Sequence, residues 1–144
     1  MRKANAIAVA FAAILGATPA VAGQGDQIDQ LFAAADGNYA EKGYHPSGWS
    51  QRGAAGQGAE VRFTVPLEGD KDHSLVGVCD TDCSNIDMQL LDGSGTEVAR
   101  DVEADDVPIV GTHAATPQNY TLVVQMVSCS ADSCAFGIKG YVKD

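Results

Sequence analysis

The sequence has little positive charge and lacks the short motifs that mark common hydrolases and redox proteins. Nine lysine and arginine residues stand against 19 aspartate and glutamate residues, so the formal net charge is −10 at pH 7. Such a surface repels nucleic acids and anionic lipids, whose binding depends on basic side chains. No G-x-S-x-G or H-E-x-x-H pattern is present, and no two cysteines stand in a C-x-x-C pair. The sequence therefore predicts neither a nucleic-acid-binding protein nor an enzyme.

The one long hydrophobic run lies at the N-terminus. Arg2 and Lys3 precede an apolar run from Ala4 to about Ala17, and the small residues Ala-Val-Ala follow at 20–22. This order predicts a secretory signal peptide over residues 1–22, and the run is too short for an ordinary membrane span. No cysteine directly follows the cleavage pattern, so we expect no lipid anchor. The remaining 122 of 144 residues lose two positive charges, carry a net charge of −12, and should form one periplasmic or secreted domain.

All four cysteines lie beyond the cleavage pattern. An even number of cysteines in an oxidising compartment predicts two disulfides. The local pairs Cys79–Cys83 and Cys129–Cys134 are favoured, since each closes a short loop between strands. Cross-pairing of the two loops is the alternative if their strands are neighbours. A zinc site is disfavoured, because the spacings are C-x3-C and C-x4-C and the loops are acidic.

The first part of the exported chain has a helical pattern that gives way to a glycine-rich stretch. Apolar residues recur at helical spacing and predict a short amphipathic helix over about Gln27–Lys42: Ile28, Leu31, Phe32, Ala35 and Tyr39. We expect Gly23–Gly25 to be a loose terminus and the helix to pack on the edge or end of a β-domain; a partner-binding helix is the alternative. Residues 44–58 contain several glycines and few large apolar side chains, which predicts an irregular linker.

Beyond the linker, short apolar or alternating runs are separated by turn signals. The expected strands cover residues 61–65, 74–79, 86–90, 96–100, 107–110, 120–127 and 135–142. No helical period follows Lys42. The pattern predicts an all-β domain, an antiparallel β-sandwich or jelly roll of about seven or eight strands, over residues 59–144. The short helix and the linker occupy residues 23–58 before it.

Several of these runs are similar to a known family in their order. They are Val61–Pro66 (VRFTVP), Asn85–Asp92 (NIDMQLLD) followed by Gly-Ser-Gly, Asp105–Val110 (DDVPIV) and Asn119–Val124 (NYTLVV). From about Ala59 to Val142 the sequence resembles the bacterial pre-peptidase C-terminal domain, in a stand-alone secreted form. The resemblance implies a β-sandwich and a non-catalytic accessory or binding role. The chain departs from the family at Pro117–Tyr120, which lacks the glycine before the long strand, and at Asn85, which is often acidic.

Two acidic loops suggest a calcium-binding site, which is the most specific functional hypothesis that the sequence offers. Asp80, Asp82 and Asp87 offer carboxylates within eight residues, and Asn85 offers a further oxygen. Calcium takes six to eight oxygen ligands in a flexible geometry. The loop with Asp101, Glu103, Asp105 and Asp106 could complete the site if it folds nearby, and Asp105 and Asp106 are the expected contributors. The alternative is two solvated acidic loops that discourage pairing between sheet edges.

The single tryptophan, Trp49, either covers the core or belongs to a surface site with Tyr44 and Tyr120. The leading functional prediction is a monomeric, non-catalytic binding or accessory module of the bacterial envelope or secretome, with a protein or polysaccharide ligand. One alternative is a calcium-stabilised structural interaction domain, with calcium as the sole expected cofactor. Another is a small hydrolase with an unrecognised site; the three histidines, His45, His73 and His113, each lie in a loop or at a strand start.

Overall fold

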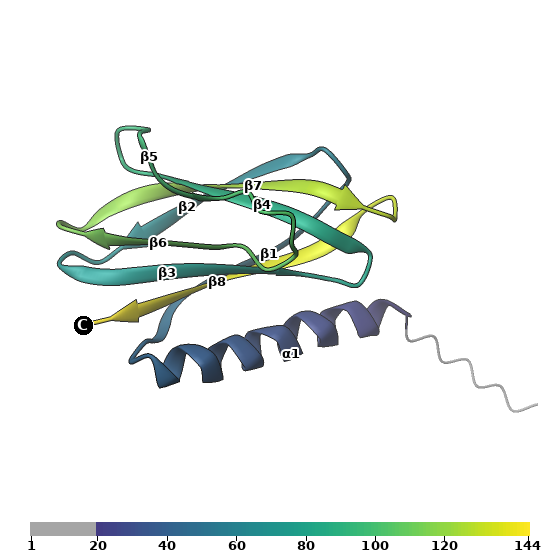
Figure 1. The fold of residues 1–144 in the computed structure, drawn as a ribbon, viewed down its shortest axis with the longest axis horizontal. Coiled ribbons are helices and arrows are strands. Elements are labelled where there is room, and N and C mark those ends of the chain that lie inside the picture. The colour runs from purple at the N-terminus through teal and green to yellow at the C-terminus, as the bar shows by residue number, and fades with distance from the viewer. Residues whose placement is uncertain (1–19) are drawn as a thin grey trace, which may run out of the picture.

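The protein folds as two four-stranded sheets that face each other, with one helix on the outer face of the first sheet (Figure 1). This computed structural model describes residues 20–144, with side chains from residue 27 onward. Its elements are α1 (Ala20–Glu41), β1 (His45–Ala55), β2 (Glu60–Leu67), β3 (Lys71–Cys79), β4 (Cys83–Leu91), β5 (Glu97–Asp101), β6 (Ile109–Ala114), β7 (Gln118–Cys129) and β8 (Cys134–Lys143). The order is β1-β8-β3-β6 in sheet A and β2-β7-β4-β5 in sheet B, with antiparallel pairing throughout. The predicted all-β sandwich is confirmed.

The core between the sheets follows the alternation seen in the sequence. In β4, Ile86, Met88 and Leu90 point inward, and the residues between them are partly exposed. Leu122 and Val124 of the neighbouring β7 face the same core. Period-two alternation places every second side chain on one face, so these strands bury one face and leave the other to solvent.

Residues 45–55 form β1, so the linker expected at residues 44–58 is wrong over most of its length. β1 is the edge strand of sheet A and pairs only with β8, so most of its side chains are exposed and show no apolar alternation. Gly53 is needed inside this strand, because a Cβ there would lie 2.8 Å from Cζ of the buried Phe136 ring. A glycine in a strand often marks such a close approach.

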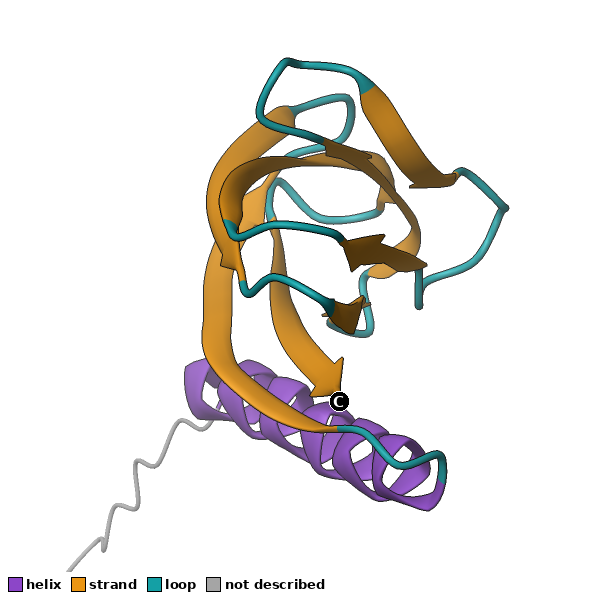
Figure 2. Cartoon of the chain, turned by 90° about the vertical axis from the view of Figure 1, so that its left-hand side faces the viewer, coloured by secondary structure: helices purple, strands orange, loops and turns teal. Residues whose placement is uncertain are grey.

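Helix α1 lies across the outer face of sheet A, and not at an edge or end of the domain (Figure 2). Its backbone also includes Gly23–Gly25, which was expected to be a loose terminus. Ile28, Phe32 and Tyr39 pack with Tyr141 and with the outward-facing Val76 and Val78 of β3. β3 is therefore buried on both faces, which explains its continuous apolar run.

The disulfides are Cys79–Cys83 and Cys129–Cys134, as the favoured pairing predicted. Both lie at one end of the sandwich, where Cys83 is paired in register with Cys129. β6 begins after Pro108 and runs to Ala114, so the strand expected at 107–110 starts later and replaces part of the expected loop. The predicted signal peptide lies outside the described residues except for its last three. Among residues 20–144, no helix is both long and apolar enough to cross a membrane.

Candidate functional site

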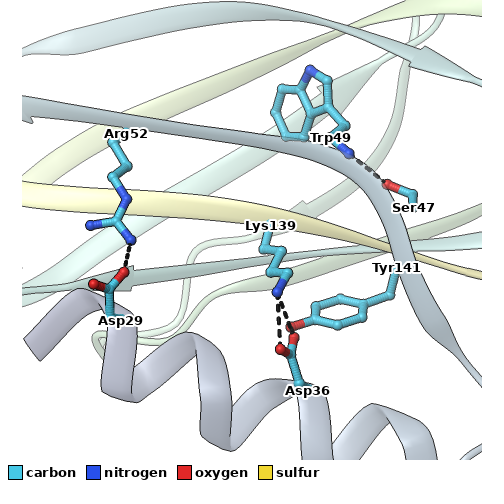
Figure 3. A network of polar contacts seen from close by, with 7 residues as sticks. All are labelled: Asp29, Asp36, Ser47, Trp49, Arg52, Lys139 and Tyr141. Carbon is cyan, nitrogen blue, oxygen red and sulfur yellow. Dashed lines mark hydrogen bonds and ion pairs between the residues drawn. The ribbon is translucent and has the colours of Figure 1, made fainter. Parts of the chain in front are cut away.

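A network of polar contacts fastens α1 to sheet A (Figure 3). The Asp36 carboxylate accepts hydrogen bonds from the Tyr141 hydroxyl at 2.6 Å and the Lys139 ammonium at 3.0 Å. Burial raises the pKa of Tyr141, and its bond to Asp36 raises it further, so this hydroxyl stays protonated and donates. Burial alone would raise the pKa of Asp36, but its bonds to Lys139 and Tyr141 lower it overall. The Asp29–Arg52 ion pair adds a contact nearer the start of the helix. Together these contacts hold α1 in one position on the outer face of sheet A.

The three aromatic residues predicted to form a ligand surface lie in separate environments. Tyr44 packs edge-on against Tyr39 under the end of α1, with ring centroids 5.3 Å apart. Trp49 is partly buried against the sandwich core, as the core-cover interpretation predicted. Tyr120 is 4% exposed and lies between the sheets. The structure therefore does not bring these rings together on one concave surface.

An apolar groove of about 360 Å³ runs between α1 and the β6 side of sheet A. Its floor includes Val76 and Val78 of β3. One wall is the helix flank with Leu31 and Ala34, and the opposite wall includes Ile109. The helix packs on β8, β3 and β1, so the β6 side of the sheet remains uncovered. The position of the helix thus creates the groove.

A second feature adjoins the groove and was missed from the sequence. We call residues 98–109 the acidic–apolar segment; it spans most of β5, the following loop and the first residue of β6. In the described part of the chain, the large apolar side chains that are exposed all lie in it: Val98 (40%), Val102 (50%), Val107 (40%) and Ile109 (46%). The four acidic residues of the second acidic loop lie among them. In the sequence the apolar and acidic residues of this segment are interspersed, and this mixing is the pattern that could have predicted the surface.

Carboxylates of the segment hold its own backbone in place. Asp101 accepts hydrogen bonds from the backbone N–H of Ile109 at 2.9 Å and of Glu103 at 3.2 Å. Asp105 accepts one from the N–H of Val107 at 3.0 Å. Such bonds from Asp to nearby backbone N–H groups preorganise a loop. These bonds fix the backbone conformation of the segment.

The residues predicted to bind calcium are only partly brought together. Asp80 is 2% exposed, and its two carboxylate oxygens accept hydrogen bonds from the backbone N–H groups of Asp82, at 3.1 Å, and Ala135, at 2.7 Å. Asn85 and Asp87 each have a buried Oδ1 without a hydrogen-bond partner among the described residues. Within residues 20–144, no three His, Cys, Asp or Glu side chains converge as a metal site would require. Calcium binding stays a prediction, and the structure gives Asp80 a structural role.

Asp87→Asn should raise the stability of the protein at pH 7. Burial raises the pKa of Asp87, and the charges of Asp101 and Asp105 raise it further. Because its pKa is higher in the folded than in the unfolded chain, the ionised carboxylate lowers stability above the folded-state pKa. That cost fades as the pH falls through the raised pKa and is gone below the ordinary value of 3.8.

Urea melts of both proteins at several pH values will test this expectation. The stabilising effect of Asp87→Asn should shrink steadily as the pH is lowered. The matched control is Asp132→Asn, which removes one exposed charge at a turn. An effect of Asp87→Asn that is independent of pH, or equal to that of the control, would show that the ionised Asp87 carboxylate does not lower the stability of the fold.

The histidines do not form a catalytic arrangement with the cavities. His113 is exposed, and its hydrogen bond with Asp72, at 2.8 Å, raises the pKa of the imidazole. His73 is buried, and its Nε2 lies 2.9 Å from the backbone oxygen of Glu68. Neither the groove nor a smaller 60 Å³ pocket beside Asp87 is lined by His, Ser or Cys. The two cavities therefore lack the Ser or Cys nucleophile and the histidine base of a triad-type hydrolase.

No protein-family model matches the chain, and no curated protein matches it either. Among solved structures the chain is similar to PliG of Aeromonas hydrophila, described as a periplasmic lysozyme inhibitor of g-type lysozyme. The two share 10% identity, with a TM-score of 0.44 over 66% of this chain and 85% of PliG. This distant likeness does not assign a family or a partner to the chain.

Proposed function

We propose that this protein is an exported, non-catalytic module that binds a basic partner protein through the acidic–apolar segment. One observation carries the proposal: the exposed large apolar side chains of the described chain are confined to these 12 residues, among four acids. Exposed apolar side chains gathered in one place, with charged groups around them, are typical of protein-binding sites. The two disulfides and the expected signal peptide support export.

The charge of the chain favours a basic partner. Its formal net charge is −10, and four acidic residues are interspersed with the exposed apolar residues of the segment. Complementary charge at the rim of an interface speeds association and excludes wrong partners. An acidic partner would be repelled from the same surface.

The chemistry of the surface also favours a protein over a polysaccharide. Exposed aromatic rings would offer a sugar a flat surface for stacking. Tyr120, however, is buried. Trp49 packs against the core between the sheets, and Tyr44 packs against the apolar side chains under α1. Valine and isoleucine side chains suit the apolar core of a protein interface better. The resemblance to the pre-peptidase C-terminal domain agrees with this accessory role.

Glu103→Gln combined with Asp106→Asn should weaken binding to basic proteins by about fivefold or more, roughly 1 kcal/mol. These two side chains make no hydrogen bond among the described residues, so the loop should keep its shape. The loss should lie mostly in the association rate and shrink as salt is added, because exposed charges act over a Debye length. The measurement is surface plasmon resonance against a panel of small basic proteins, lysozymes and cytochrome c among them, at two salt concentrations.

The matched control removes two charges elsewhere. Asp70→Asn combined with Asp132→Asn changes exposed acids in turns outside the segment, and asparagine tolerates the positive φ of 57° at Asp70. Binding by this control should stay within about twofold of wild type. Equal losses for both pairs would mean diffuse attraction between charged proteins, and no binding to any basic protein would refute the proposal.

A further inference from the structure

Sheet A is only partly covered on its outer face, and the uncovered part forms the groove. Helix α1 fills the space above β8 and β3 but leaves β6 open. Val107 and Ile109 line the groove and also belong to the acidic–apolar segment. The groove and the Val107–Ile109 end of the segment are therefore one continuous surface, and what binds there can enter the groove. Val102 instead lines the small pocket beside Asp87, on sheet B.

The helix side of the groove allows another backbone to come close. Leu31, Ala34 and Asn38 follow one another along α1 at spacings of three and four residues, on the flank beside β6. The alanine in the middle of this flank leaves space where a larger side chain would stand. Two helices with small residues at their contact can approach to an interaxial distance of about 8 Å. The α1 residues that line the groove extend from Leu31 to Lys42, so an element that fills it would lie alongside α1.

The charged residues at and beside the groove determine which side chains a bound element should carry next to its apolar face. Glu41 lines the groove towards the end of α1, and the acidic loop leads into it at Val107. The one cation that lines it, Lys42, lies over the Tyr39 ring with Nζ 5.4 Å from the ring centroid. Glu41 and Lys42 balance each other within the groove, so the net negative charge next to an incoming element comes from the acidic loop at the Val107 end.

From these observations we infer that the groove receives an amphipathic helix of the partner, with an apolar stripe facing Val76 and Ile109 and basic residues beside the acidic loop. This inference rests on the proposed function and names the part of the partner that binds. An added strand is the other common way to bind beside a sheet edge. It would lie in the plane of sheet A, whereas the groove lies above that plane, between β6 and α1.

The test uses two designed peptides of about 16 residues, a little over four helical turns. The first carries leucines on one helical face and lysines on the other, and the second has the same composition in scrambled order. The first should bind the oxidised protein, gain helical circular dichroism, and compete with basic proteins. The scrambled peptide should bind at least about tenfold more weakly, or 1.4 kcal/mol.

Two substitutions on α1 locate the site. Ala34→Trp places a large ring in the groove and should weaken binding of the amphipathic peptide by about tenfold or more. Ala33→Trp is the matched control, because Ala33 is an exposed alanine of the same helix that does not line the groove. It should change binding by less than about twofold. Thermal melts of both variants show that each still folds.

The outcomes separate this inference from the proposed function. Equal binding of both peptides, equal effects of the two tryptophans, or an extended bound peptide would overturn the helix-in-groove inference. Basic proteins could then still depend on Glu103 and Asp106, which would leave the proposed function standing. If instead the amphipathic peptide binds in the groove while the change of Glu103 and Asp106 has no effect on basic proteins, the proposed function fails alone.

Discussion

Asp80→Ala should lower the free energy of unfolding by about 3 kcal/mol, since it removes two hydrogen bonds to a buried carboxylate. The side chain links the Cys79–Cys83 loop to the start of β8, through the N–H groups of Asp82 and Ala135. Without the carboxylate, the Ala135 N–H would lose its partner at a partly buried position. Urea denaturation of the oxidised protein, monitored by circular dichroism, measures the loss.

Asp82→Ala is the control for this prediction. Asp82 lies in the same acidic loop, but it contributes to the fold through its backbone, whose oxygen accepts bonds from the N–H and Oγ of Ser130. The substitution keeps that oxygen and should cost less than about 0.5 kcal/mol. The loss for Asp80→Ala should be the same with calcium and with a chelator. A loss that appears only in the presence of calcium would return Asp80 to the role of a metal ligand.

Strands with one buried face could be predicted from the sequence, and the edge strand β1 could not. In β4, every second side chain points into the core and is apolar, while the side chains between them are polar: the apolar ones are Ile86, Met88 and Leu90. In β1 only Ala55 is fully buried, so selection for apolar side chains is weak along its length. The pairing of β1 with β8 depends on backbone hydrogen bonds, which leave no pattern in the sequence.

The candidate site was harder to predict because it depends on which face each side chain takes. Residues 107–110 contain three apolar side chains and predict a buried strand. In the structure Val110 points into the core, while Val107 and Ile109 are exposed beside the groove. Tyr120 was predicted to belong to a ligand-binding surface, but it is buried. Its spacing from Leu122 and Val124 already indicated the inner face of the strand. The groove itself requires the docking of α1, which no local pattern describes.

The role of Asp80 was hard to predict for a similar reason. In a turn, an aspartate that binds a metal and one that binds a backbone N–H look the same in sequence. The partner that decides the role of Asp80 is Ala135, 55 residues further along the chain. Such pairings follow from the tertiary fold alone, so residue types near one another in sequence could not distinguish a calcium ligand from the structural role that Asp80 has in the fold.

Gly137→Val should destabilise the protein by about 2–3 kcal/mol, although valine suits a β-strand better than glycine does. Gly137 lies in β8 directly beneath α1. A Cβ at this position would lie 2.7 Å from Cζ of Phe32 and 3.0 Å from Cγ2 of Ile28. Both side chains are buried under the helix, so α1 would have to move away from the sheet. Urea denaturation gives the loss, and faster hydrogen exchange in α1 would locate it.

A double-mutant cycle with Phe32→Ala tests whether the clash with the helix is the cause. Phe32→Ala alone should cost about 3 kcal/mol, because it leaves a cavity under α1. In that background Gly137→Val should cost less than about 1 kcal/mol, since the new methyl groups can occupy the space of the ring. Additive losses would place the strain of Gly137→Val within sheet A, and the helix would then tolerate a side chain at this position. Because the groove exists only while α1 is docked, Gly137→Val should also abolish binding of the amphipathic peptide under conditions where the sandwich remains folded.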